Sequence, residues 1–283
     1  AQCLVGSEMC IRDRYICNPC VVVHSFQIEL TDDKIKGLMI AIGLSVVVHM
    51  VLIIGSEILS FIFHFNSIEK ASIIYTNAGY LVIPLVGAVL GEEWVFYTTA
   101  FILVQTVLMW THGVKLIGQE KELNIRKILC NPNVIAMIIG IALFALEIRL
   151  PTVVDSCVSG FGDMISPASM MVIGMVIGDV DLKWVFRQKR PYLICLLRLI
   201  VFPLIAVVAF AGLERSGIHP DAEYILMIVL IATSAPAAAM ITQLAQIYGK
   251  DSRYASVINV MSVIFCIITM PVMVLSYEML IAL

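Results

Sequence analysis

The feature that most constrains this chain is a series of long apolar stretches, separated by short segments that carry most of the charge. Of the 283 residues, 60% are hydrophobic and only 14% are charged. A soluble domain carries about 25% charged residues, so this chain lacks the polar surface that water requires. In lipid, backbone polar groups must be satisfied within helices or closed barrels, and the period-two alternation of a barrel is absent. The sequence therefore predicts an all-α polytopic membrane protein.

The apolar stretches also predict how many times the chain crosses the membrane. At about 20 apolar residues per spanning helix, the length accommodates eight to ten spans and no separate soluble domain. We expect a short fragment at 16–28 and full spans at 35–63, 71–90, 94–116, 131–146, 153–177, 191–213, 224–248 and 255–283. The net charge of −3 is spread over the loops and indicates no nucleic-acid partner.

Lysine and arginine gather in alternate loops, which sets the expected orientation. One set of loops contains eleven of them and the opposite set contains four. The eleven are Lys70, Lys115, Lys121, Arg126, Lys127, Lys183, Arg187, Lys189, Arg190, Lys250 and Arg253. By the positive-inside rule these loops are expected to face the cytoplasm, and the C-terminus is expected outside.

The first fourteen residues, AQCLVGSEMCIRDR, differ from the chain that follows because they are polar and have no helical or strand period. Residues 4–14 resemble the in-frame translation of a sequencing adapter. We therefore interpret residues 1–14 as an artefact that is excluded from fold reasoning. The native sequence is expected to begin near Tyr15.

Two weak internal similarities occur in the same order along the chain. The segment 19–33 (PCVVVHSFQIELTDD) parallels 167–181 (PASMMVIGMVIGDVD), and 91–93 (GEE) parallels 249–251 (GKD). A unit of about 150 residues with five spans crosses the membrane an odd number of times, so two copies must lie inverted. The pattern predicts two inverted five-helix repeats.

The repeat divides the chain and indicates what it lacks. We expect a first repeat at 15–117, a cytoplasmic linker at 118–130 and a second repeat at 131–283. The offset between the two copies predicts that the first repeat lacks about thirty residues, which would form its first helix and the following loop.

Two spans are interrupted at repeat-related positions, at 75–84 (YTNAGYLVIP) and 232–237 (ATSAPA). In inverted-repeat transporters, such broken helices place half-helix N-termini near the bilayer midplane, where free N–H groups and partial positive charge suit a carboxylate. A proline that merely kinks a membrane helix is the alternative for either break alone. The candidate substrate-binding residues at the breaks are Thr76, Asn77, Gly79, Pro84, Thr233, Ser234 and Pro236. Gln243 and Asn259 join them, because amides in the last two spans would be costly facing lipid.

Several motifs occur in order along the chain: 75–91 (YTNAGYLVIPLVGAVLG), 131–140 (NPNVIAMIIG), 166–178 (SPASMMVIGMVIG), and 234–249 with 269–271 (TMP). Together they resemble the auxin efflux carrier family of membrane transporters. The similarity runs from about Asn18 to the C-terminus. It implies ten helices in two inverted repeats with crossing broken helices, secondary transport of organic anions, and a homodimer.

The resemblance also implies roles for particular residues. In that family the Asn matched by Asn77 and the Gln matched by Gln105 line the substrate site, and the crossover prolines match Pro84 and Pro236. The short linker favours a prokaryotic member, including the malate and malonate permease types, in the bacterial inner membrane. The resemblance therefore implies a small dicarboxylate as substrate and alternating access as mechanism.

Two ionisable side chains fall inside expected spans and are coupling candidates. Glu57 and Arg198 each lie about seven residues from the cytoplasmic end, roughly 10 Å deep. We expect them to pair, so that protonation of Glu57 would couple transport to a proton. The alternative for Arg198 is snorkelling to the interface.

Two other function classes are open. Residues 160–163 spell the GxGD pattern of intramembrane aspartyl proteases, which need two facing carboxylates. Asp155 and Asp163 would be about 12 Å apart on one helix, too far for a dyad, so we prefer polar packing near the outer face. The second alternative is a non-transporting membrane sensor on the same fold.

No cofactor or metal site is expected. Cys17 and Cys20 have CxxC spacing without a second ligand pair, and His24, His49 and His112 are scattered. No GxxxxGK[ST] phosphate loop is present, so ATP would not drive transport directly. The expected partners are a small organic anion, the lipid bilayer and a coupling proton or cation.

Overall fold

The computed structural model describes residues 16–29, 31–118, 130, 132–164, 167, 171, 174, 178, 182–215, 217 and 219–282. Throughout this part every regular element is helical, and the only extended pairing is one isolated β-bridge. Four helical segments are long and apolar enough to cross a membrane: Asp32–Phe63, Glu92–Gly118, Arg190–Glu214 and Ser252–Ile281. The prediction of an all-α polytopic membrane protein is therefore confirmed.

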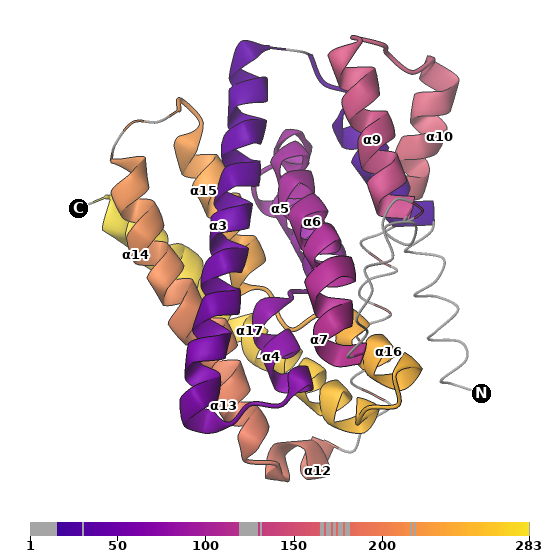
Figure 1. The fold of residues 1–283 in the computed structure, drawn as a ribbon. Coiled ribbons are helices and arrows are strands. Elements are labelled where there is room, and N and C mark those ends of the chain that lie inside the picture. The colour runs from indigo at the N-terminus through magenta and orange to yellow at the C-terminus, as the bar shows by residue number, and fades with distance from the viewer. Residues whose placement is uncertain are drawn as a thin grey trace.

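The helices follow one another in the order labelled in Figure 1. They are α2 (Asn18–Ser25), α3 (Asp32–Phe63), α4 (Ser67–Ile74), η2 (Ala78–Val82), α5 (Ile83–Val89), η3 (Glu92–Trp94), α6 (Val95–Leu108), η4 (Met109–Gly113), α7 (Val114–Gly118), α9 (Pro132–Ala145), α10 (Thr152–Asp163), α12 (Leu182–Arg187), α13 (Arg190–Leu196), η5 (Leu197–Val201), α14 (Phe202–Glu214), α15 (Ala222–Ser234), α16 (Ala239–Ile247) and α17 (Ser252–Ile281).

Two of the expected spans are each built from separate pieces. The span expected at 71–90 is divided among α4, the π-helical turn η2 and α5, and the span expected at 224–248 is divided into α15 and α16. Both interruptions fall within the segments where the sequence predicts breaks, 75–84 and 232–237. The repeat relationship itself stays a prediction, since most of 167–181 lies outside the described residues. Residues 1–14 and most of the linker at 118–130 also lie outside them.

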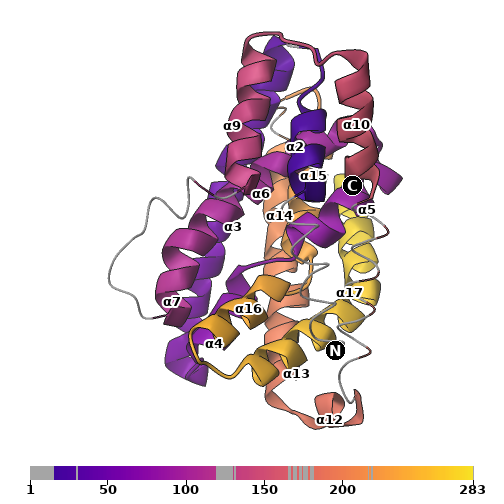
Figure 2. The ribbon, with the colours of Figure 1, turned by 90° about the vertical axis from the view of Figure 1, so that its right-hand side faces the viewer.

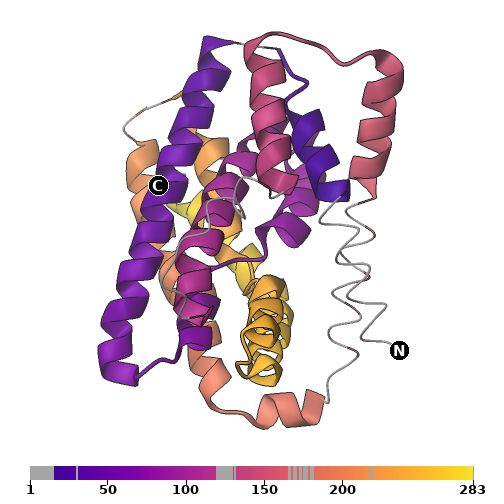
Figure 3. The same cartoon turned by 45° about the vertical axis from the view of Figure 1, so that its right-hand side comes forward.

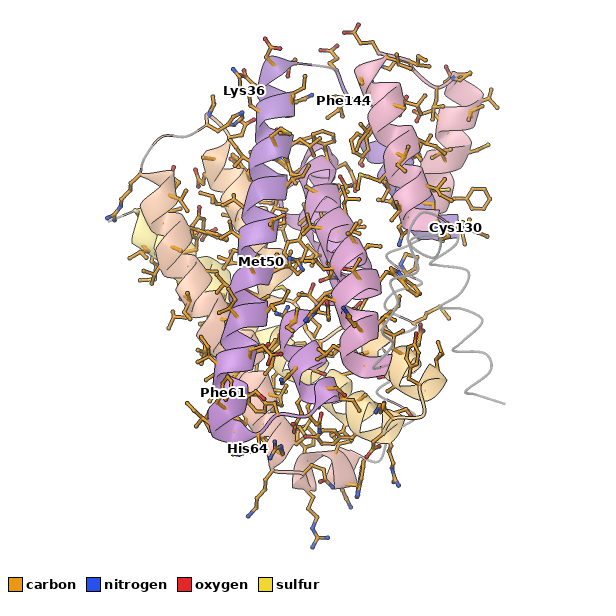
Figure 4. All side chains as sticks on the ribbon, viewed as in Figure 1. Lys36, Met50, Phe61, His64, Cys130 and Phe144 are labelled. Atoms are coloured by element: carbon orange, nitrogen blue, oxygen red, sulfur yellow. The ribbon has the colours of Figure 1, made fainter. Side chains whose placement is uncertain are left out.

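The long helix α3 shows why the chain turns where it does. Thr31 caps its first turn by accepting a hydrogen bond from the Lys34 amide, and two aspartates follow at the positive end of the helix dipole. The helix ends at His64, whose left-handed backbone (φ 53°, ψ 56°) stops it. Figure 4 shows Lys36 and His64 at opposite ends of α3, with Met50 and Phe61 between them.

Large apolar side chains cover much of the outer surface. Phe61 on α3 is 84% exposed, and Val208 on α14 and Ile267 on α17 are also exposed. In contrast, every residue from Ile225 to Ser234 on α15 is buried. This distribution suits a bundle that faces lipid outside and packs helix on helix inside.

The described helices form two groups. The small group consists of α2, α9 and α10, in which α9 and α10 each pack on α2, at one end of the molecule (Figures 2 and 3). The large bundle consists of α3 to α7 and α12 to α17. The two groups meet mainly through α6, which packs on α2 and α9.

Three phenylalanines join the groups at this contact. Phe96 on α6 packs edge-on against Phe26 at the end of α2, with ring centroids 5.0 Å apart. Phe144 on α9 lies 5.4 Å from Phe96 and 6.1 Å from Phe26. The large bundle, which contains both broken helices, is thus a body distinct from the small group.

Candidate functional site

The two broken helices cross where their backbones are extended. After α4 ends, Tyr75 is extended (φ −98°, ψ 133°), and after α15 ends, Ala235 is extended (φ −66°, ψ 154°). Extended residues cannot satisfy their own backbone groups within a helix, so in a membrane they need other partners.

Each break supplies the partners that the other needs. The Asn77 amide donates to the Pro236 carbonyl oxygen at 2.8 Å, and the Ala238 amide donates to the Tyr75 carbonyl oxygen at 3.1 Å. These bonds form an antiparallel bridge between Thr76 and Ala237. The sequence patterns at 75–84 and 232–237 therefore mark two segments that lie together in space; we call this meeting point the crossover.

The prolines at the breaks occupy different places. Pro236 lies within the bridge, where its missing N–H needs no acceptor and its carbonyl oxygen bonds to Asn77. Pro84 lies beyond the π-helical turn, in the first turn of α5, where its missing N–H costs nothing. Gly79 lies in η2, between the bridge and Pro84.

A side chain from a third helix holds the first break in place. The Gln105 Oε1 on α6 accepts hydrogen bonds from the Thr76 amide at 2.9 Å and from the Thr76 hydroxyl at 2.8 Å. The Gln105 Nε2 donates to the Thr76 carbonyl oxygen at 2.9 Å. The Gln105 amide thus pairs with the Thr76 backbone as a neighbouring strand would. The hydrogen bonds of Gln105 therefore hold the backbone of the crossover.

Four half-helix ends meet at the crossover. The C-terminal ends of α4 and α15 arrive there with partial negative charge and with carbonyl oxygens that have no acceptor role within their own helix. The η2–α5 segment and α16 begin there, with unpaired amides and partial positive charge. The crossover therefore has a carbonyl side and an amide side.

Arg198 lies on the carbonyl side and not where the sequence predicted. Its side chain on η5 is fully buried; Nε donates to the Ala235 oxygen at 3.2 Å and Nη1 donates to the Ile73 oxygen at 3.0 Å. Nη2 has no partner in the described part of the chain. The snorkelling alternative is therefore wrong, because the guanidinium points into the bundle.

The expected pair between Glu57 and Arg198 is also absent from the described residues. The Glu57 carboxylate instead accepts from Lys70 Nζ at 2.7 Å, and its side chain is 46% exposed. The pair was wrong because both residues were placed by depth alone, and depth does not fix which face of a helix a side chain occupies.

Several predicted residues lie at the crossover with unused polar groups. The Asn77 and Asn259 side chains are 7% and 4% exposed and have no hydrogen-bond partner among the described residues. The Ser234 hydroxyl is buried and unpartnered within the same part of the chain.

Two other predicted residues differ from these three. The Thr233 hydroxyl donates to the Val229 carbonyl oxygen of its own helix at 2.7 Å. Gln243 lies half-buried on α16.

Sequence reasoning missed Ser262 at the crossover and gave no role to His49, which is also buried. The Ser262 hydroxyl on α17 accepts from the Ala237 amide at 3.1 Å and donates to the Asn259 carbonyl oxygen at 2.7 Å. His49 is fully buried on α3, where Nδ1 lies 2.7 Å from the Ser45 oxygen and the ring centroid lies 4.8 Å from that of Phe101 on α6; Nε2 has no hydrogen-bond partner among the described residues. Both residues stand in apolar runs without a nearby Gly or Pro, so no sequence signal distinguishes them.

A second buried polar cluster joins α4 to α13 and α17. It lies at the end of the large bundle that contains Lys70, Lys189 and Arg190, which we call the basic end. Glu69 on α4 is fully buried and completes a capping box with Asn66. Its carboxylate accepts from the Arg190 guanidinium, with Nη2 to Oε2 at 3.1 Å, and from the Tyr254 hydroxyl at 2.7 Å. This cluster fixes the start of α4 against α13 and α17.

The aspartates of the GxGD pattern do not form a catalytic pair. Asp155 and Asp163 lie at opposite ends of α10, and Asp163 is exposed. Asp155 is instead 2.9 Å from His24 Nδ1 on α2. The protease alternative therefore has no support from the geometry. Within the described residues, no group of three or more His, Cys, Asp or Glu side chains is placed to hold a metal.

Comparison with known proteins gives one positive finding. A family model described as a membrane transport protein matches residues 14–124 and 121–274, which together make up most of the chain. The search of curated proteins found no match to this chain.

Proposed function

Because this chain belongs to the membrane transport protein family, we propose that it is a secondary transporter of small organic anions such as dicarboxylates. The observation that carries the proposal is the crossover, where two broken helices exchange backbone hydrogen bonds inside the large bundle. Broken helices at the midplane are the characteristic substrate sites of inverted-repeat transporters.

The substrate carboxylate binds on the amide side of the crossover. The first amides of the η2–α5 segment and of α16 lack helical acceptors and carry partial positive charge. The Asn77 and Asn259 side chains are nearly buried and have no partners among the described residues, so both are available to a ligand. Gln105 sets the position of Thr76 and hence of Asn77, through three hydrogen bonds to Thr76.

Transport proceeds by alternating access, in which the large bundle moves against the small group. Support comes from the contacts between the two groups, which are made mainly by α6 on α2 and α9. The contact of Phe26, Phe96 and Phe144 is made by apolar rings, so no hydrogen bond between these side chains has to break when the groups separate.

The finer properties follow from the same proposal. The transporter works as a homodimer in the bacterial inner membrane with its C-terminus outside, and malate or malonate is the first substrate to test. Coupling to a proton would involve Glu57, whose carboxylate meets Lys70 near the basic end of the large bundle.

Uptake of labelled malate and malonate into vesicles tests the proposal. We expect the wild-type protein to accumulate at least one of the two anions. Asn77→Ala should reduce uptake, and Asn77→Asp should reduce it further because it places a negative charge beside the carboxylate. Unfolding temperatures equal to that of the wild type show that neither variant has lost its fold. If a folded wild-type protein takes up no carboxylate, the carrier proposal is wrong and the result favours the membrane-sensor alternative.

A further inference from the structure

The buried guanidinium of Arg198 joins the C-terminal ends of two different broken helices. Its Nε donates to the carbonyl oxygen of Ala235, just after α15, and its Nη1 donates to that of Ile73, in the last turn of α4. The side chain itself comes from η5, on a third helix, and is fully buried. One cation thus contacts both negative helix ends at the crossover.

The charges at this point nearly cancel. A helix C-terminus carries roughly −0.5 elementary charge, so two of them carry about −1 in total, which matches the single positive charge of a guanidinium. Within the described residues Arg198 has no carboxylate in salt-bridge contact. The helix ends are therefore its counterion, and a buried charge without any counterion would be strongly unfavourable.

In other inverted-repeat transporters, half-helix C-terminal ends and unwound carbonyl oxygens coordinate a transported Na⁺ or H⁺. A metal cation needs several oxygen ligands directed at one point. Here the Ala235 and Ile73 oxygens already accept from a fixed cation, and a second positive charge beside it would be repelled.

We propose that Arg198 is a built-in cation of the crossover, and the proposal has two parts. First, Arg198 occupies the place of a coupling metal ion, so this protein needs no metal ion there. Second, Arg198 leaves the amide side of the crossover free to attract an anion. The second part rests on the proposed function, and the first part does not. The third nitrogen, Nη2, is buried and has no partner in the described part of the chain, which leaves one charged donor unused. A lysine would keep the charge but cannot form the planar fork that reaches two carbonyl oxygens at once.

Thermal unfolding of the purified protein tests the first part without any transport assay. For the wild-type protein, replacing choline chloride with NaCl or LiCl at equal ionic strength should leave the unfolding temperature unchanged. Arg198→Ser leaves both carbonyl ends without a cation, so its unfolding temperature should be lower and should rise on addition of millimolar guanidinium or Na⁺. Arg215→Ser is the matched control, because it removes an exposed arginine from one carbonyl oxygen, that of Leu280, and leaves no buried negative group; neither cation should change its unfolding temperature.

The outcomes separate cleanly. Stabilisation of the wild-type protein by Na⁺ over choline would overturn the proposal, as would a folded Arg198→Ser variant that responds to neither cation. If Arg198→Ser does not fold, Arg198→Lys replaces it: partial recovery of stability supports a charge at this position, and stability no better than the serine variant contradicts it. Because these readouts need no substrate, a failure to find anion uptake counts against the proposed function alone.

Discussion

Replacing Gln105 with methionine tests whether this side chain holds the crossover together. Methionine has nearly the same length and volume, so the change removes the amide and little packing. The variant loses three hydrogen bonds to Thr76, a residue that is only 1% exposed. Water therefore cannot replace the lost partners without opening the bundle.

The size of the effect can be bracketed from the structure. Side-chain hydrogen bonds in membrane proteins contribute about 0.6 kcal/mol each on average, so three lost bonds give a lower limit of about 2 kcal/mol. Leaving a buried backbone N–H and C=O unsatisfied costs about 1–3 kcal/mol per group, so the two Thr76 groups give an upper limit of about 6 kcal/mol. Even the lower limit changes the folding equilibrium roughly thirtyfold.

Reversible unfolding in detergent, followed by circular dichroism, measures this free energy. Gln243→Met is the matched control, because it makes the same chemical change at a half-buried glutamine with no hydrogen-bond partner among the described residues. Thr76→Val removes only the hydroxyl bond and should cost about 1 kcal/mol. If Gln105→Met costs no more than the Gln243 control, the amide does not support the crossover and the reasoning is refuted.

Three further changes test the packing around the site by the same unfolding measurement. Glu69→Gln should cost about 2 kcal/mol, because it removes the charge that partners the half-exposed Arg190; no loss would show that this cluster does not hold α4. Phe96→Ala should cost about 3 kcal/mol, since it empties a buried site between the two groups, whereas Phe61→Ala on the exposed face should cost almost nothing. Asp155→Asn should cost less than about 1 kcal/mol, because its contact with His24 is partly exposed, and a larger loss would indicate a structural role on α10.

The sequence predicts the class of the fold and the position of the breaks, because both depend on local composition. Apolar runs indicate segments that face lipid, and Gly and Pro at 75–84 and 232–237 indicate where a helix is interrupted. Local composition does not predict the polar partners of the breaks: Gln105 is named only through the family resemblance, and there as a substrate-site residue, and Ser262 is not named at all. Gln105 and Ser262 bond to backbone groups 25 or more residues away, and that register is set by how α6 and α17 pack.

Arg198 illustrates the same limit for charged residues. Its depth in the span indicates that it needs a partner, and residue types alone point to an acidic side chain such as Glu57. The partners are two backbone carbonyl oxygens, which every residue has and which become acceptors only where a helix ends. Such a partner follows from the three-dimensional arrangement of helix ends and not from residue types.

The crossover separates residues that hold it from residues that remain free, and this division makes the two roles distinguishable by experiment. Gln105 and Arg198 use their polar groups on the backbone of the broken helices, so substitutions there should lower stability first and uptake as a consequence. Asn77 and Asn259 have amides without partners in the described part of the chain, so removing them leaves no new unsatisfied group. A ligand that binds the crossover should therefore depend on the two asparagines in variants whose unfolding temperature is unchanged. If Asn77→Ala lowers stability as much as Gln105→Met does, the asparagine is a structural support and the substrate must bind elsewhere.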